Sequence, residues 1–179
     1  MDFFKTYFDE IAAAVKNIEH TDLEQAAIMV ENISQNNKKV IVAGNGGSAA
    51  MASHVAVDFT KAAQIRAINF NEADLITCFA NDYGYENWVK EALNAYADED
   101  DLVILISSSG QSKNITNAAK RAKELGLDVI TLSGFSSDNP LRSLGDINFW
   151  IDSSNYNYVE MTHHIWLLAI VDFIISRKS

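Results

Sequence analysis

Residues 38–61, KKVIVAGNGGSAAMASHVAVDFTK, decide the fold. The short apolar run Val40–Ala43 ends at the glycine-rich turn Gly44–Ser48, and small or apolar residues continue to Lys61. An unbroken apolar run that ends at glycine is typical of a buried parallel strand. Because Ser48 can cap a following helix, the stretch predicts a strand, a tight turn and a helix.

The same pattern recurs in residues 101–125. The apolar run Leu102–Ile106 leads into the serine-rich turn Ser107–Ser112, and a helix is expected from Lys113 to Leu125. Strands that alternate with helices predict an α/β fold in which helices cover both faces of a parallel sheet. Further strands are expected at residues 65–70, 128–132 and 148–151, helices after residue 72 and after the loop 81–85, and a last helix over 158–176.

Two amphipathic helices are expected before the first strand. Residues 2–18 place apolar side chains every three or four positions, and Thr21 or Asp22 can cap a second helix with a similar stripe. Part of this surface is expected to meet another subunit, with packing on the chain's own core as the alternative. The stripes are Phe4, Tyr7, Ile11, Ala14 and Ile18 in the first helix and Leu23, Ala26, Val30 and Ile33 in the second.

The composition limits the class of protein. The chain has 179 residues, 48% of them hydrophobic, which predicts a single globular domain over residues 1–179. Residues 1–37 form its helical N-terminal segment, and residues 38–179 form the α/β core with the C-terminal helix. Lys and Arg number 14 against 24 Asp and Glu, a net charge of −10, so direct binding to a nucleic-acid backbone is not expected.

The compartment is inferred from cysteine usage and apolar patterning. Cys78 is the single cysteine, which excludes a disulfide within the chain and a zinc site built from cysteines. A membrane span needs about 18 apolar residues, and no apolar run is expected to reach this length. Residues 1–10 lack the apolar stretch of a secretory signal. We therefore expect a cytoplasmic protein without a membrane partner.

The two strand-to-helix turns are the candidate ligand site. Each feeds a helix N-terminus, where unpaired backbone N–H groups and the helix dipole attract an anion. In an open α/β sheet both turns lie at the carboxyl edge, where ligands bind. Ordinary capping turns are the alternative. A nucleotide loop is not favoured, because no acid ends the strand after the glycine turn and the chain has no G-x-x-x-x-G-K-[ST] motif.

Acids and imidazoles are paired at helical spacing in two places. His54 and Asp58 lie four residues apart, and Glu160, His163 and His164 lie within one turn of the last helix. Such groups suit proton transfer or a divalent metal, and structural histidines are the alternative.

Three segments together resemble the sugar isomerase (SIS) domain family. They are GNGGSAAMASHVAVDFT (44–60), FANDYGYE (79–86) and ISSSGQSKN (106–114), with VITLSG (129–134) following. The branch they resemble most is that of the sedoheptulose 7-phosphate isomerases. The resemblance implies a flavodoxin-like, three-layer fold with a five-stranded parallel sheet, and a homo-oligomer, a tetramer, built partly through the N-terminal helices.

The resemblance also implies a phosphorylated sugar as ligand. Its phosphate would be held by the turn hydroxyls of Ser107, Ser108, Ser109 and Ser112. The sugar would be contacted by Asn45, Gly46, Gly47 and Ser48 from the first turn and by Asn81 and Asp82 from the loop that follows the fourth expected helix.

For catalysis the resemblance implies an aldose–ketose isomerase that works through a cis-enediol. Asp58 takes the place of the family's general base, and His163 or His164 would be the acid. No cofactor is required, although a zinc ion at His54, Asp58, Glu160 and His163 is compatible with the resemblance, since the histidine at position 54 is a metal ligand in some members.

One departure keeps other functions open. Aligning Glu160 and His163 on the family pattern places Leu168 where the branch carries its catalytic histidine. A non-catalytic SIS protein that binds a phosphosugar or a protein partner, of the DnaA-initiator-associating type, is therefore an alternative. An isomerase of another phosphosugar is a further one.

Overall fold

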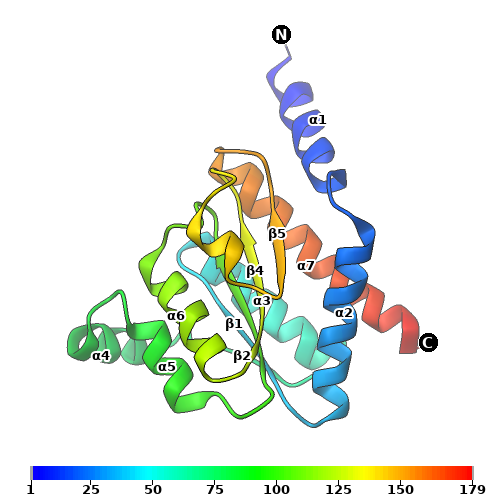
Figure 1. Ribbon diagram of the computed structural model, residues 1–179. Coiled ribbons are helices and arrows are strands. Elements are labelled where there is room, and N and C mark those ends of the chain that lie inside the picture. The colour runs from blue at the N-terminus through cyan, green and yellow to red at the C-terminus, as the bar shows by residue number, and fades with distance from the viewer. Residues whose placement is uncertain (1, 179) are drawn as a thin grey trace.

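The computed structural model describes residues 2–178 and is built on one parallel five-stranded sheet of order β2-β1-β3-β4-β5 (Figure 1). The sequence-based prediction of this sheet is confirmed, and the strand boundaries differ from it by a few residues. The strands are β1 (Val40–Ala43), β2 (Ala67–Asn69), β3 (Leu102–Ser107), β4 (Asp128–Ser133) and β5 (Ile147–Trp150).

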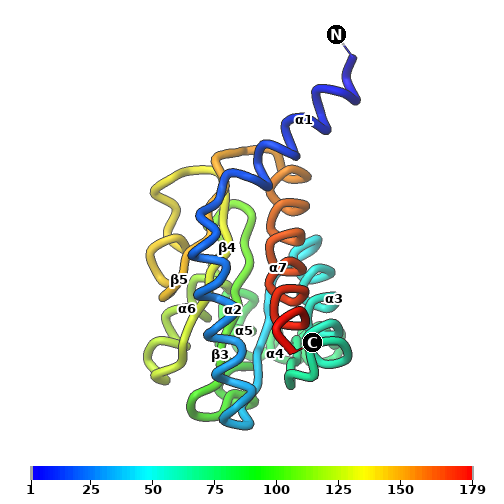
Figure 2. The backbone as a smooth tube through the Cα atoms, turned by 90° about the vertical axis from the view of Figure 1, so that its right-hand side faces the viewer, coloured from blue at the N-terminus to red at the C-terminus, as the bar shows by residue number. Residues whose placement is uncertain are grey.

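Helices cover both faces of the sheet. Helices α2, α3 and α7 pack on one face, and α5 and α6, with α4 beside them, pack on the other (Figures 1 and 2). The helices are α1 (Phe3–Lys16), α2 (His20–Gln35), α3 (Gly47–Lys61), α4 (Ala73–Tyr83), α5 (Trp88–Tyr96), α6 (Lys113–Glu124) and α7 (Tyr156–Lys178), with a short 3₁₀ turn η1 (Pro140–Ser143) before β5.

The strands alternate between two apolar cores. Val40 and Val42 of β1 face the core formed with α2, α3 and α7, whereas Ile41 and Ala43 face the core formed with α5 and α6. Because both faces are covered, all four residues of β1 are buried and apolar. This explains why the strand appears in the sequence as an unbroken apolar run rather than an alternating one.

A buried ion pair joins the amino ends of β1 and β3. Lys39 Nζ lies 2.6 Å from Asp101 Oδ2, and Asp101 Oδ1 accepts a hydrogen bond of 2.9 Å from the Lys39 backbone N–H. Burial disfavours the Lys39 charge, but the contacts with Asp101 and Asp98 outweigh it and raise the lysine pKa. The edge of the sheet opposite the turns is thereby fixed.

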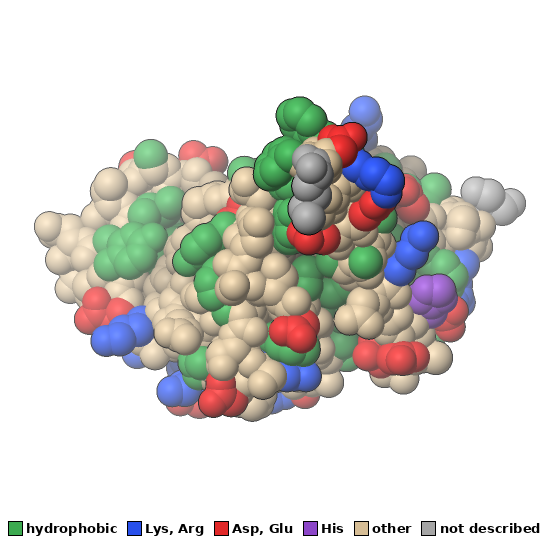
Figure 3. Space-filling view, turned by 90° about the horizontal axis from the view of Figure 1, so that it is seen from above, with side chains coloured by type: hydrophobic (Ala, Val, Ile, Leu, Met, Phe, Trp, Pro, Cys, Tyr) green, Lys and Arg blue, Asp and Glu red, His purple; other side chains and the backbone are tan. Residues whose placement is uncertain are grey.

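Helix α1 projects from the body of the fold (Figures 1 and 2). No residue of α1 is buried, and Phe3, Phe4 and Phe8 are exposed. Seen from above, hydrophobic side chains gather on this helix (Figure 3). Contact with α7 is made through the rings of Tyr7 and Tyr158, whose centroids are 4.9 Å apart. A hydrogen bond to Glu10 raises the pKa of the Tyr158 phenol to about 12.

The second N-terminal stripe behaves differently from the first. Ala26, Val30 and Ile33 of α2 are buried in the chain's own core. The expected unpartnered surface is therefore confined to α1, and α2 follows the alternative of packing on its own core.

Helix α7 is an exception to the expectation that no apolar run is long enough to span a membrane. Among residues 2–178 it is the one helix long and apolar enough to cross a membrane by length and composition. In the fold it packs against α1, α2 and α3, and its apolar residues Trp166, Leu167 and Ile170 are buried in the core. Its hydrophobicity is accounted for by the position of a central core helix.

The Lys39–Asp101 pair generates a stability prediction. Asp101→Ala removes the buried partner of Lys39, so the free energy of unfolding should fall by about 3–5 kcal/mol. The measurement is urea denaturation followed by circular dichroism. The matched control is Asp98→Ala, because Asp98 also pairs with Lys39 at 2.6 Å but its side chain is 73% exposed. A loss as large for Asp98→Ala as for Asp101→Ala would contradict the assignment.

Candidate functional site

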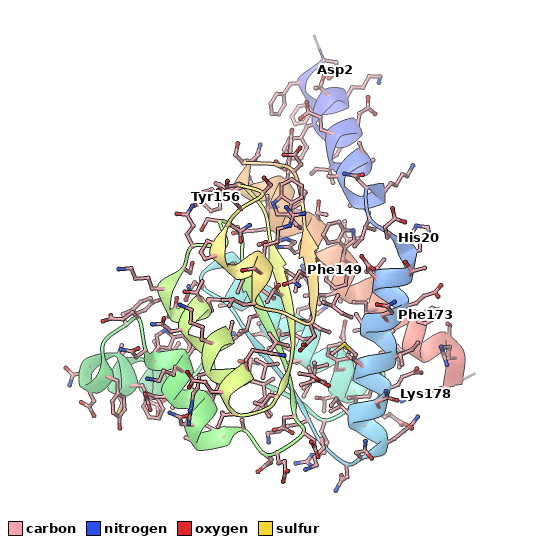
Figure 4. All side chains as sticks on the ribbon, viewed as in Figure 1. Asp2, His20, Phe149, Tyr156, Phe173 and Lys178 are labelled. Carbon is pink, nitrogen blue, oxygen red and sulfur yellow. The ribbon has the colours of Figure 1, made fainter. Side chains whose placement is uncertain are left out.

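Three chain segments meet at the carboxyl edge of the sheet. Because β1 pairs directly with β3, the turns that follow these strands are neighbours, and α3 and α6 begin beside each other. Helix α7 starts at the same end of the molecule, where Tyr156 lies in Figure 4. Between them is a cavity of about 120 Å³, lined by Asn45, Ser48, Ile106, Ser107, Ser108, Ser109, Ser112, Tyr156 and Glu160.

The serine turn leaves the start of α6 available to a ligand. Ser112 is the N-cap residue of α6, yet its side chain makes no capping bond and instead lies 3.0 Å from the Ser107 hydroxyl. The N–H groups of the first helical turn keep their partial positive charge toward the cavity. The neutral donors of this turn therefore suit a phosphate group.

Gly110 gives the serine turn its shape. It has φ +66°, a conformation that favours glycine, and a Cβ there would collide with the side chain of Asn139. Asn139 is buried and donates from Nδ2 to the Gly134 carbonyl at 3.1 Å and to the Ser133 hydroxyl at 3.2 Å. The loop after β4 thus packs against the serine turn at Gly110 and fixes its conformation.

An amide pair joins the two turns. Asn45 Nδ2 donates to Asn114 Oδ1 at 3.0 Å, and Asn114 Nδ2 donates to Asn45 Oδ1 at 2.8 Å. The Tyr85 hydroxyl also donates to Asn45 Oδ1, at 3.1 Å. The sequence reasoning missed Asn114 because it sought hydroxyl donors. The sequence did hold a signal for it: an amide side chain occupies a position on the buried face of α6, next to Ile115.

Glu160 reaches the start of α3. A Cβ at Gly47 would collide with the Glu160 carboxylate, so the carboxylate lies against the helix N-terminus and only glycine fits there. A negative charge at this end of a helix is stabilised by the dipole. Since Glu160 would repel a phosphate, the anion should bind on the serine side of the cavity, with the rest of the ligand passing Glu160.

The acid–imidazole groups form one cluster beyond the cavity. His164 Nε2 lies 2.9 Å from His54 Nδ1, and His54 Nε2 lies 3.2 Å from Asp58 Oδ2. Burial and the neighbouring His54 lower the pKa of His164, and Asp58 opposes this effect. Helices α3 and α7 therefore bring together His54, Asp58 and His164.

His163 does not belong to this cluster, although the sequence analysis names it as a candidate acid and metal ligand. Its side chain is fully buried, with Nε2 3.0 Å from the Ser133 carbonyl oxygen. Burial lowers its pKa to about 4, so the ring stays neutral at pH 7. Consecutive helical residues point in directions about 100° apart, which separates His163 from His164.

The predicted metal set is also not assembled. His163 faces the core, Glu160 lies at Gly47, and both ring nitrogens of His54 contact other side chains. Across residues 2–178 no three His, Cys, Asp or Glu side chains are grouped to hold a metal ion. The residues present do not fit the zinc site that the resemblance allowed.

Asn81 and Asp82 lie elsewhere than expected. Both belong to the last turn of α4 rather than to a loop, and both are exposed. Asn81 Nδ2 donates to Asp82 Oδ1 at 2.9 Å, and neither side chain lines the cavity. The segment instead reaches the site through Tyr85. Of the predicted sugar contacts, Asn45 and Ser48 line the cavity, and Gly46 and Gly47 lie between them in the chain.

Comparison with known proteins gives consistent matches. The SIS domain family matches residues 5–134. A phosphoheptose isomerase of Fusobacterium nucleatum is 33% identical over 175 residues, which cover 94% of this chain and 90% of that protein.

Two solved structures share the whole architecture. The phosphoheptose isomerase GmhA of Neisseria gonorrhoeae has a TM-score of 0.88 at 27% identity, covering 97% of both chains. A phosphoheptose isomerase of Francisella tularensis has a TM-score of 0.89 at 27% identity, covering 98% of this chain and 97% of the other.

The serine turn generates a binding prediction. Sugar phosphates should raise the melting temperature, measured by differential scanning fluorimetry, whereas the same sugars without phosphate should not. Replacing Ser109 and Ser112 by Ala removes two donors, each worth about 1.5–3 kcal/mol to a charged group, and should weaken the shift. Ser143→Ala, in η1 and outside the cavity, is the control. Equal stabilisation by phosphorylated and unphosphorylated sugars would contradict a phosphate site.

Proposed function

Since the chain belongs to the SIS domain family, we propose that it is an aldose–ketose isomerase of a sugar phosphate, with sedoheptulose 7-phosphate as its substrate. The similarity to proteins named phosphoheptose isomerase, over nine-tenths of the chain and at the level of the whole fold, supports this activity. The non-catalytic alternative is not favoured by these relatives.

One observation carries the proposal: helices α3 and α7 both run from the anion cavity to the acid–base cluster. Near the cavity Glu160 of α7 lies against Gly47 of α3, and farther along His164 of α7 bonds to His54 of α3. A ligand anchored by phosphate at the serine turn can extend between these helices toward the cluster. Binding and proton transfer are therefore available to one elongated molecule.

The reaction needs a base and an acid beside the sugar carbonyl. A base removes the proton from the carbon next to the carbonyl, a cis-enediol forms, and a proton returns to the neighbouring carbon. Positioned acid–base groups contribute about 10²–10⁴-fold to such steps. The cluster of Asp58, His54 and His164 supplies groups of this kind. Leu168 packs partly into the core, and its apolar side chain has no group that could donate or accept a proton.

Phosphate selection follows from the cavity lining. Within the described chain, the lining residues include no lysine or arginine, and hydroxyls and helix N–H groups provide the donors. Such neutral, oriented donors bind an anion at close range. Phosphate binding at this site therefore fixes one end of the sugar and leaves the carbonyl end to the acid–base cluster.

The proposal includes a homo-oligomer, a tetramer, in which α1 packs against other copies. Its support is the exposed aromatic surface of Phe3, Phe4 and Phe8 on a helix with no buried residue. An exposed apolar surface of this kind is typical of an interaction site.

Light scattering coupled to gel filtration tests the assembly. The mass at micromolar concentration should be four times the 19.8 kDa of the chain. The double variant Phe4→Ser, Phe8→Ser should lower it, because the apolar surface is lost, while Tyr96→Ser on α5 should not. A wild-type mass equal to one chain would exclude the oligomer.

Turnover tests the proposed activity. Asp58→Asn keeps the shape of the side chain and removes its charge, so isomerisation of sedoheptulose 7-phosphate should slow by about 10²–10⁴-fold while thermal stabilisation by the substrate persists. Asp74→Asn, an exposed acid of α4, is the control and should be unaffected. If the wild-type protein exchanges no proton of heptose, hexose or pentose phosphates with deuterated solvent, the isomerase proposal is wrong.

A further inference from the structure

The stripe of α7 that lines the cavity continues to His164. Tyr156, Glu160 and His164 are spaced four residues apart and so share one face of the helix. Tyr156 and Glu160 line the anion cavity. His164 is the next residue of the stripe, about 6 Å farther along the helix axis.

The facing stripe of α3 runs parallel to it. Gly47 touches Glu160, and His54, seven residues or two turns later, bonds to His164. The same two helix faces therefore meet at the cavity and at the imidazoles. A ligand held at the serine turn and passing Glu160 reaches His164 before it reaches Asp58, which lies one further turn along α3.

The hydrogen bonds within the cluster define which nitrogen atoms of the two imidazoles carry a proton. An ionised Asp58 can only accept, so the His54 Nε2 atom at 3.2 Å carries the proton. Neutral His54 then accepts at Nδ1, and His164 donates to it from Nε2 at 2.9 Å. This leaves the lone pair of His164 on Nδ1. Asp58 is engaged by His54, and His164 Nδ1 is the open end of the chain of bonds.

We propose that His164 Nδ1 is the base that exchanges the proton with the substrate, and that His54 and Asp58 are positioning residues acting through it. This inference rests on the isomerase function proposed above. It changes the expected role of Asp58 from direct base to the group that stabilises the charge formed on the imidazole pair.

The proton transfer balances without another reactant. The C–H bond beside the carbonyl breaks, its proton goes to His164 Nδ1, and its electron pair forms the C=C bond of an enediolate. His164 passes its Nε2 proton to His54, whose positive charge then lies beside Asp58. The hydroxyl proton moves to the former carbonyl oxygen. His54 returns its proton, and His164 delivers one to the neighbouring carbon as the new carbonyl forms.

The surroundings of His164 suit this role. His54 Nδ1 holds its Nε2 atom at 2.9 Å, and burial and the nearby His54 lower its pKa, an effect that Asp58 opposes.

The test is a double-mutant cycle on the full-length protein with sedoheptulose 7-phosphate, measuring isomerisation and uptake of solvent deuterium at the reacting carbon. His164→Gln keeps an amide donor toward His54 and should lower kcat by about 10²-fold or more with little change in KM. In the His164→Gln background, Asp58→Asn should not lower kcat further, because the proton relay that Asp58 supports is already lost. His20→Gln, an exposed histidine of α2, is the control.

A substrate-induced thermal shift that persists in each variant shows that the variant is folded. His164→Asn serves as a second variant at the same position. Asp58→Glu should recover part of the activity lost in Asp58→Asn. The inference is overturned if His164→Gln and His164→Asn keep kcat within a few-fold of wild type, or if Asp58→Asn lowers kcat further in the His164→Gln background. A wild-type protein without any exchange instead overturns the proposed function, and His164 then has no reaction to serve.

Discussion

The fold depends on burying both faces of a parallel sheet. The helices that connect the strands provide this burial, and the direct pairing of β1 with β3 places the starts of α3 and α6 side by side. Backbone N–H groups at these starts supply the positive character that the side chains lining the cavity lack. The anion cavity is thus a consequence of strand order rather than of charged residues.

The sequence was sufficient for the features that local patterns determine. The apolar run Val40–Ala43, the two turns and the alternation of strands and helices led to the sheet as observed. Side-chain direction needed the packed fold, because neighbours such as His163 and His164 differ only in which helix face the core covers. The Asn45–Asn114 pair could not be foreseen, since it spans 69 positions and forms only when both turns are in place.

Different parts of the site bind the ligand and move protons. Helix starts and hydroxyls at the serine turn hold the charged end of the ligand, while α3 and α7 carry the groups that move protons. Gly47 and Gly110 allow the close approaches on which both parts rely, at Glu160 and Asn139 respectively. Small residues at these two points therefore determine the geometry as much as the reactive groups do.

The absence of lysine and arginine from the lining side chains, within the described chain, also affects how fast a ligand arrives. A dianion approaching a chain of net charge −10 is repelled at long range and attracted only at contact with the helix starts. Salt at about 0.1 M screens the repulsion at separations beyond about 10 Å but acts little on short hydrogen bonds inside the cavity. Capture should consequently quicken with ionic strength, the reverse of what basic phosphate-binding clefts show.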